Sequence, residues 1–307
     1  MTKNLQPAGH GFEPGRFLLL CSAVMAFCGM VMLFVMVIAF ALPVFAESGA
    51  GGPFSWIWAP GQGRFGILPM LTGSLCVGSI ALLIGWPLAF FLCSWLLCPE
   101  RSSSVFQRAV RRCVGTLVRI MTAIPTVVYG FAAVFLLAPS IRQGLGGTGF
   151  GWLTASIMLS LLILPTIVLV LQAGLAPRLD ALALPGQALG FSRLELLWHV
   201  VLPQARGTLL ASAVLGFGRA VGDTMLPLML AGNATVVPDS ILGGVRTLTA
   251  HMALVTANEV GGAAYQSLFM AGLFLLVINA VVSICLKRLG VRSGSSREGS
   301  HGRGGQP

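Results

Sequence analysis

Long apolar runs alternate along the chain with short segments rich in Arg, Gly and Pro. A helix needs about 20 residues to cross the hydrocarbon core of a bilayer, and six runs are long enough. Four of them carry no charged residue, namely Phe17 to Ala46, Phe65 to Pro99, Gln143 to Pro177 and Val260 to Leu286. The other two hold isolated charges: Cys113 to Pro139 contains Arg119, and Gly207 to Gly232 contains Arg219 and Asp223. The pattern therefore predicts an all-α membrane protein with six spans.

The distribution of Lys and Arg sets the expected orientation. With the N-terminal end inside, 14 of the 19 basic residues fall in inner segments, and the outer loops hold only Arg64, Arg142 and Arg246. Because positively charged loops remain in the cytoplasm, both ends of the chain are predicted to be cytoplasmic. We expect a cytoplasmic segment over residues 1–16, a six-helix membrane domain over 17–287, and a disordered tail rich in Gly, Ser and Arg over 288–307.

Composition supports this class of protein. Hydrophobic residues make up 56% of the 307 residues and charged residues only 9%, against about 25% charged in soluble domains. Inner loops and anionic lipid account for the net charge of +10, so no nucleic-acid partner is implied. The seven cysteines show no zinc-binding spacing, so no metal site is predicted. Val44 to Ala46 resembles a signal-peptidase site, but the apolar run before it is about twice the secretory length, which favours a retained first helix.

Arg219 and Asp223 are opposite charges inside an apolar run. Residues four apart share a helix face, so a continuous helix would let the two side chains touch. One interpretation is a structural salt bridge that joins the fifth span to its neighbours. The other is a path for an oxyanion, in which Arg219 donates to the anion and Asp223 takes its place when the path is empty. Thr224 and Asn233 would then add neutral donors.

The segment between the fourth and fifth spans has the pattern of a short helix. Ser192 and Glu195 match the capping box S-x-x-E, which marks a helix start. Leu194, Leu197, Trp198 and Val201 recur at helical spacing, while Arg193, Glu195 and His199 lie on the polar side. Gly190 is a plausible turn before this helix, and Pro203 ends it. The segment is either an interfacial helix on the inner leaflet or a docking element for a cytoplasmic partner.

The stretch ALGFSRLELLWHVVLPQA resembles the signature loop of ABC importer permeases, in which a Gly is followed at a fixed interval by Leu-Pro. Gly190, Leu202 and Pro203 match that signature. The resemblance implies that Gly190, Ser192, Arg193, Glu195, His199 and Pro203 belong to a segment that docks an ATPase. The chain departs from the family where Glu-Ala-Ala usually opens the signature, because Leu184, Pro185 and Gly186 stand there.

Three more stretches are similar to the membrane subunits of phosphate-specific ABC importers, of the PstC type. They are RFGILPMLTGSLCVGSIALLIGWPLAF from Arg64, AIPTVVYGFAAVFLL from Ala123, and GRAVGDTMLPLMLAGN from Gly218. The resemblance covers roughly Phe54 to Leu286. At Arg119 the family leads us to expect an acid, so the local charge is reversed.

This resemblance implies a six-helix importer subunit in a bacterial inner membrane that carries inorganic phosphate. Its expected partners are a PstA-type permease, two ATPase subunits that use ATP and Mg, and a soluble phosphate-binding protein outside the membrane. A PstA-type role for this chain, or another oxyanion such as sulfate or molybdate, remains open.

Catalytic alternatives have little support in the sequence. A nucleotide-binding P-loop needs G-x-x-x-x-G-K-[ST], and neither Lys3 nor Lys287 has that context. No cofactor is therefore expected in this chain, and hydrolysis must come from a partner. An intramembrane aspartyl protease needs two aspartates, and Asp223 is the only one inside the spans. An ion-coupled secondary transporter is the stronger rival, although no inverted repeat is visible.

Overall fold

The computed structural model describes residues 14–47, 54–99, 104–258 and 262–294. Helices account for most of the chain in these ranges, and four long ones coincide with the four uncharged runs: α1 (Pro14–Glu47), α2 (Leu68–Leu97), α6 (Trp152–Ala181) and α13 (Gly262–Gly294). In the described ranges, five helices are long and apolar enough to span a membrane, and a pair joined by an 80° bend adds a sixth. The structure thus confirms the all-α membrane fold, with five spans among the described residues, or six if the bent pair counts as one span.

The third expected span is not one helix. It divides into α3 (Val105–Met121), α4 (Thr126–Ala132), a π-helical stretch (Ala133–Leu137) and α5 (Ala138–Leu145). The break falls before Pro125, which lacks a backbone N–H and disfavours helical geometry in the preceding residue. The expected helix over Cys113 to Pro139 is therefore wrong, and the apolar length sufficient for a span is Thr126–Leu145.

The fifth span is also divided. Its first helix is α10 (Arg206–Gly222), and a short helix, α11 (Met225–Leu230), follows the break. Before α10 lie α7 (Ala183–Ala188), α8 (Arg193–Leu196), a π-helical stretch (Leu197–Val201) and α9 (Leu202–Gln204). The helical run from Arg193 to Gln204 meets α10 at the 80° bend, so the segment before the fifth span is folded.

The segments expected outside the membrane contain structure that the hydropathy pattern does not reveal. Strands β1 (Trp58–Ala59) and β2 (Arg64–Phe65) pair antiparallel across a 3-10 turn (Pro60–Gln62), with Trp58 opposite Phe65. Helix α12 (Leu248–Asn258) follows the fifth span. The rings of Trp58 and His251 meet edge to face with centroids 4.3 Å apart, which holds the hairpin against α12.

The core forms around α6. Every fourth residue of this helix is fully buried: Leu159, Ile163, Ile167, Leu171, Leu175 and Leu179. Helices α2 and α10 pack against it, and glycines allow the close approach. A Cβ on Gly85 would lie 3.0 Å from the Ser160 carbonyl oxygen, and one on Gly216 would lie 2.7 Å from Ile167. Small residues serve helix contacts in membranes, where lipid offers no hydrophobic advantage to association.

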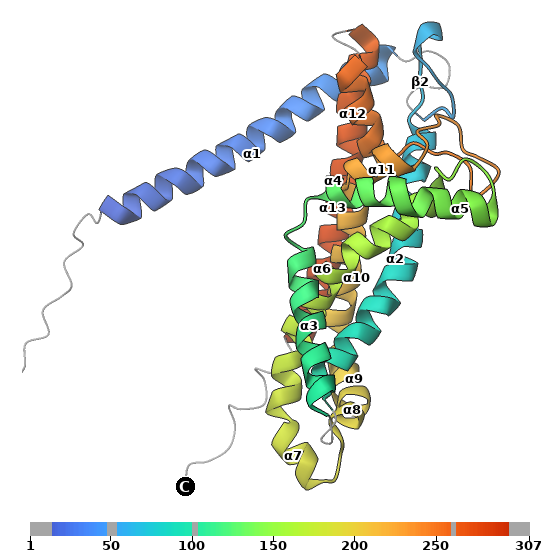
Figure 1. The fold of residues 1–307 in the computed structure, drawn as a ribbon. Helices are drawn as coiled ribbons and strands as arrows, with labels where there is room; N and C mark the ends of the chain where they lie inside the picture. Colours follow the sequence, from blue (N-terminus) through green and yellow to red (C-terminus); the bar gives the residue numbers. More distant parts are fainter. Residues whose placement is uncertain (1–13, 48–53, 100–103, 259–261, 295–307) are drawn as a thin grey trace, which may run out of the picture.

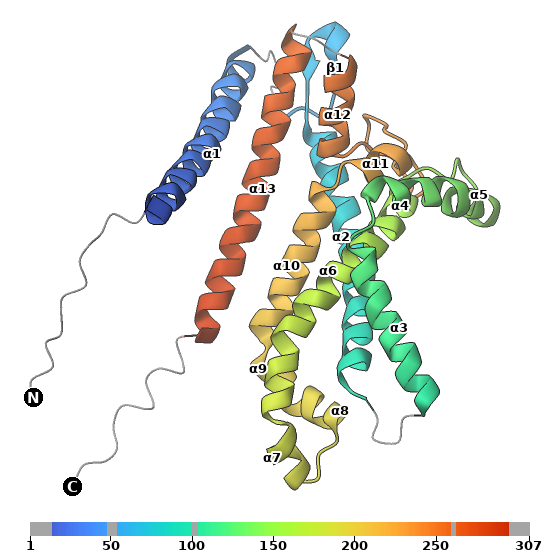
Figure 2. The ribbon, with the colours of Figure 1, turned by 60° about the vertical axis from the view of Figure 1, so that its left-hand side comes forward.

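Figures 1 and 2 show the arrangement in space. The hairpin and α12 lie at one end of the bundle, and α7 and α8 lie at the other. The Glu47 end of α1 and the Gly262 end of α13 both lie toward the hairpin, so along the chain α1 runs toward the hairpin end and α13 runs away from it (Figure 2). The assignment of that end to the cytoplasm remains a prediction from the basic residues.

Candidate functional site

The charged break in the fifth span is the first candidate site. Helix α10 ends at Gly222, and Asp223 has an extended backbone with φ −74° and ψ 134°. Pro227 explains this position, because a proline ring clashes with the carbonyl four residues earlier in a continuous helix. The Asp223 carbonyl accepts a hydrogen bond from Thr249 Oγ1 at 2.8 Å instead. The freed backbone group is thus satisfied by α12.

The break changes the relation between Arg219 and Asp223. The expectation that they share one helix face is wrong, because the helix ends between them. Asp223 Oδ2 accepts from the backbone N–H of Leu226 at 2.9 Å, as a helix cap does. Among the described residues, no ion pair within 4.0 Å joins Arg219 to Asp223. The Arg219 side chain is exposed on the surface of this chain.

The two neutral candidates differ in what they do. Thr224 is half-buried at the start of α11, and its hydroxyl makes no capping hydrogen bond. Asn233 has a left-handed backbone with φ 55°, and its amide Nδ2 donates to the Leu228 carbonyl at 2.7 Å. The backbone carbonyl of Asn233 accepts a hydrogen bond from Arg246 Nε at 3.0 Å. Asn233 therefore closes the turn after α11, and its role as a donor to substrate remains a prediction.

Residues beside this break were missed by the sequence analysis. Thr249 bonds the break directly, and Ser74 of α2 accepts from the backbone N–H of Leu248 at 2.7 Å. Thr247 and Thr249 share a hydrogen bond of 3.2 Å between their hydroxyls. Their signal in the sequence is the T-x-T pattern at the start of α12, but only the fold brings it to Asp223, 26 residues earlier.

The segment between the fourth and fifth spans is the second candidate site. The Ser192 and Glu195 capping box is confirmed, with both reciprocal hydrogen bonds present. The Ser192 backbone N–H and hydroxyl both donate to the Glu195 carboxylate at 2.8 Å, which holds the pKa of that carboxyl below its usual range. Gly190 has φ 83° and makes the turn between α7 and α8. The predicted short helix and its turn are therefore correct.

The remaining candidates of this segment are partly exposed. Arg193 Nη2 lies 3.4 Å from Asp180 Oδ1, which ties α8 to the end of α6. His199 is exposed and its Nδ1 lies 3.1 Å from the Glu195 carbonyl oxygen. Pro203 is exposed one residue before the helical run ends. On the inner side Leu197 and Val201 are fully buried, so the segment is anchored to the bundle by its apolar face.

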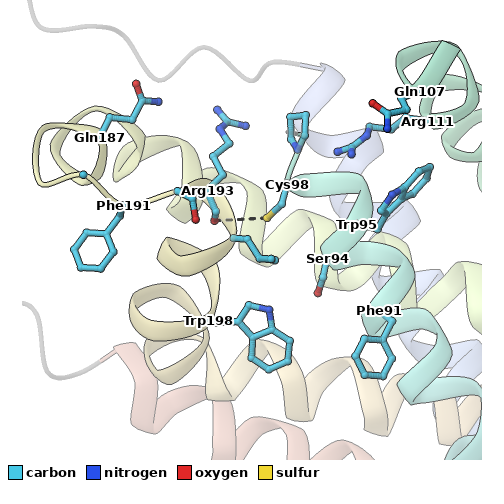
Figure 3. A pocket seen from close by; sticks show the side chains of 14 residues that line it. Phe91, Ser94, Trp95, Cys98, Gln107, Arg111, Gln187, Phe191, Arg193 and Trp198 are labelled. Atoms are coloured by element: carbon cyan, nitrogen blue, oxygen red, sulfur yellow. Dashed lines mark hydrogen bonds between the residues drawn. The ribbon is translucent and has the colours of Figure 1, made fainter. Parts of the chain in front are cut away.

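A cavity of about 780 Å³ lies between this segment and the ends of α2 and α3 (Figure 3). It is lined by Phe91, Ser94, Trp95, Cys98, Pro99, Gln107, Arg111, Gln187, Gly190, Phe191, Ser192, Arg193, Leu194 and Trp198. Cys98 Sγ lies 3.6 Å from the Arg193 carbonyl oxygen across it. The lining holds two arginines and no carboxylate, so the cavity favours an apolar or anionic surface.

Solved structures share this fold. A chain from the inward-facing MetNI methionine ABC transporter aligns with a TM-score of 0.58 at 18% identity, covering 77% of this chain and 99% of that one. A chain from an amino acid ABC transporter crystallised with histidines aligns with a TM-score of 0.53 at 13% identity, covering 74% and 93%. This chain therefore shares its fold with chains of these two ABC transporters.

The sequence comparisons give the family. Residues 101–293 match the family described as the inner membrane component of binding-protein-dependent transport systems, and the chain belongs to this family. The probable ABC transporter permease YqgH of Bacillus subtilis is 32% identical, covering 78% of this chain and 76% of that protein. The phosphate transport system permeases PstC of Xylella fastidiosa and Pasteurella multocida are each 28% identical, with coverage of 80% and 80%, and of 81% and 82%. The chain is thus a multi-pass membrane component of a transport system.

Proposed function

We propose that this chain is the PstC-type permease subunit of an ATP-driven importer that carries inorganic phosphate across the bacterial inner membrane. The observation that carries the proposal is the similarity to PstC permeases over about four-fifths of the chain. That aligned length includes a span broken beside an exposed arginine. Phosphate transport is what those relatives are named for, and the break supplies a group suited to an oxyanion.

Arg219 is the residue we assign to phosphate. Its guanidinium presents several N–H donors in a fixed fork that matches phosphate oxygens. A charge near the bilayer centre costs about 2.5–3.5 kcal/mol on insertion scales, which disfavours a lipid-facing position. Since Asp223 caps α11 and does not neutralise Arg219 by direct contact, the guanidinium is open to a passing anion. Thr224 follows the break, and its hydroxyl makes no capping hydrogen bond.

The complete importer requires other subunits. We assign docking of the ATPase pair to α7–α9, because this segment is rigidly capped and projects from one end of the bundle (Figure 1). ATP and Mg would be bound by those subunits. A PstA-type permease would complete the membrane path, and a phosphate-binding protein would deliver the anion from the opposite side. The expected Glu-Ala-Ala is replaced here, and Leu184 is 81% exposed in its place, so this contact is more apolar than the signature implies.

The decisive experiment is phosphate uptake by the Arg219→Gln variant in cells that lack other phosphate importers. We expect uptake to be abolished, while the partner subunits still co-purify with the variant. The matched control is Arg142→Gln, an exposed arginine at the end of α5, which should import phosphate at the wild-type rate. Normal uptake by Arg219→Gln would exclude the assigned role of Arg219.

A second measurement separates an ABC importer from an ion-coupled transporter. The complex purified with its partners is placed in vesicles, and uptake is followed with ATP or with an ion gradient. An ATP requirement supports the importer, whereas gradient-driven flux by this chain alone contradicts it.

A further inference from the structure

Helix α3 carries three arginines on one face. Arg108, Arg112 and Arg119 are separated by four and seven residues, so at 3.6 residues per turn they fall within about 40° of one another. All three side chains are exposed. In the described parts of the chain, no carboxylate lies within 4.0 Å of any of them. The stripe extends for about 16 Å along the helix.

The fourth arginine of α3 has a different role. The Arg111 guanidinium lies 4.9 Å from the centre of the Trp95 ring and donates to the Leu96 carbonyl at 3.4 Å. Val118, two turns further, is 3% exposed. These contacts fasten α3 to the bundle by another face. The orientation of the three-arginine face is therefore fixed by packing, and that face is left uncovered by this chain.

The Arg119 end of the stripe leads to the helix that packs against the fifth-span break. Arg119 lies two residues before Met121 in the last turn of α3. The Tyr129 hydroxyl of α4 donates to the carbonyl of Met121, the last residue of α3, at 2.9 Å. Gly130, the next residue, packs on α11, where a Cβ added to it would lie 2.5 Å from the Met229 sulfur. Helix α4 thus joins the arginine stripe to the helix that follows the break.

We infer that Arg108, Arg112 and Arg119 form a series of phosphate-binding steps leading from Arg219 toward the cytoplasmic end of the path. This inference rests on the proposed function. Several weak sites in sequence allow an ion to enter and also to leave, as conduction requires. Exposed guanidinium groups without carboxylate partners supply such sites for a phosphate oxyanion. The family resemblance leads us to expect an acid at position 119. The arginine found there therefore makes the series specific to this chain.

The same chemistry would suit the phosphate headgroup of an anionic lipid. We assign the stripe to inorganic phosphate because α3 leads into α4, and α4 packs on the helix that follows the break at Asp223. A lipid contact would require only the arginines nearest the membrane surface. A lipid-headgroup site depends on anionic lipid in the bilayer and a path for inorganic phosphate does not. Transport measured in two lipid compositions therefore separates them.

The test uses the complex with its co-purified partner subunits in vesicles, with ATP inside the compartment that the ATPase faces and radioactive inorganic phosphate as the probe. We expect Arg119→Gln to lower the uptake rate by about tenfold. Arg112→Gln and Arg108→Gln should lower it by progressively less, because water screens charges more strongly toward the start of α3, away from Arg219. Arg119→Lys should recover at least half of the rate, since the charge is kept. Arg142→Gln is the control and should stay within about twofold of wild type.

Lipid composition provides the second arm. The variants are compared in phosphatidylcholine alone and in phosphatidylcholine mixed with phosphatidylglycerol. An equal loss in both supports a phosphate path, whereas a loss seen only with phosphatidylglycerol assigns the stripe to lipid and overturns the inference. If wild type imports phosphate, Arg219→Gln does not, and the three stripe variants match wild type, only this inference fails. If wild type itself shows no ATP-dependent uptake, the proposed function fails.

Discussion

The fourth and fifth spans both contain proline, yet only one of them breaks. Helix α6 runs unbroken for 30 residues with Pro165 and Pro177 inside it. The fifth span ends at Gly222 and resumes at Met225, with Pro227 in the first turn after the break. Proline removes one backbone hydrogen bond and displaces one carbonyl in each case. The different outcomes must therefore come from the surroundings.

The surroundings differ in packing and in what can replace the lost bonds. Helix α6 is held along its length by α2 and α10, and its apolar stripe is fully buried. At the fifth-span break, Asp223 caps the new helix and Thr249 bonds the freed carbonyl. An Asp side chain readily hydrogen-bonds to nearby backbone groups, and these bonds replace the backbone hydrogen bonds of a continuous helix. A proline thus breaks a span where a capping side chain is available.

The largest effect should come from disturbing the packing that keeps α6 continuous. A Cβ on Gly174 would lie within 3.0 Å of Thr208 Cβ on α10, and a β-branched neighbour yields little. A Cβ on Gly222, beside the break, would meet nothing within 4 Å. Gly174 lies inside α6, where Ala gains helix propensity over Gly, and Gly222 is the last residue of α10, where that gain is smaller. We expect Gly174→Ala to be less stable than Gly222→Ala by about 1–3 kcal/mol.

Stability of the two glycine variants is measured by unfolding in mixed detergent micelles, followed by tryptophan fluorescence. Equal midpoints would show that the contact between α6 and α10 is looser than the structure indicates. The comparison between the spans would then need another explanation.

The sequence was sufficient for some elements and not for others. The four uncharged runs are helices, because long apolar segments have few alternatives in a bilayer. The Ser192 and Glu195 box was predictable because its hydrogen bonds are local. The break at Asp223 was not predicted, since helical periodicity treats residues 219 to 223 as one turn. Pro227 held the missing signal: its ring excludes the carbonyl of Asp223 from a continuous helix.

A smaller effect should follow from removing the prolines themselves. Pro227→Ala restores an N–H and relieves the clash at residue 223, so α10 can extend through the break and bring Asp223 onto the face of Arg219. We expect phosphate uptake to fall about fivefold, because a close ion pair would compete with the anion. Pro165→Ala, in the packed α6, should change uptake by less than about twofold. Unchanged uptake in Pro227→Ala would show that Asp223 and its cap, without proline, maintain the break.

The smallest effect concerns the Ser192–Glu195 cap of α8, in the segment predicted to lie on the cytoplasmic side. Hydrogen bonds from Ser192 lower the pKa of the Glu195 carboxyl below its ordinary value of 4.5. The ionised carboxylate therefore stabilises the start of α8 above that value, and the contribution is lost as the pH falls through the lowered pKa. Glu195→Gln should reduce the thermal midpoint slightly at pH 7 and match wild type in more acidic solution. A difference that stayed constant as the pH fell would mean that the charge of the Glu195 carboxylate does not stabilise the cap, and that an amide cannot replace the carboxyl group there.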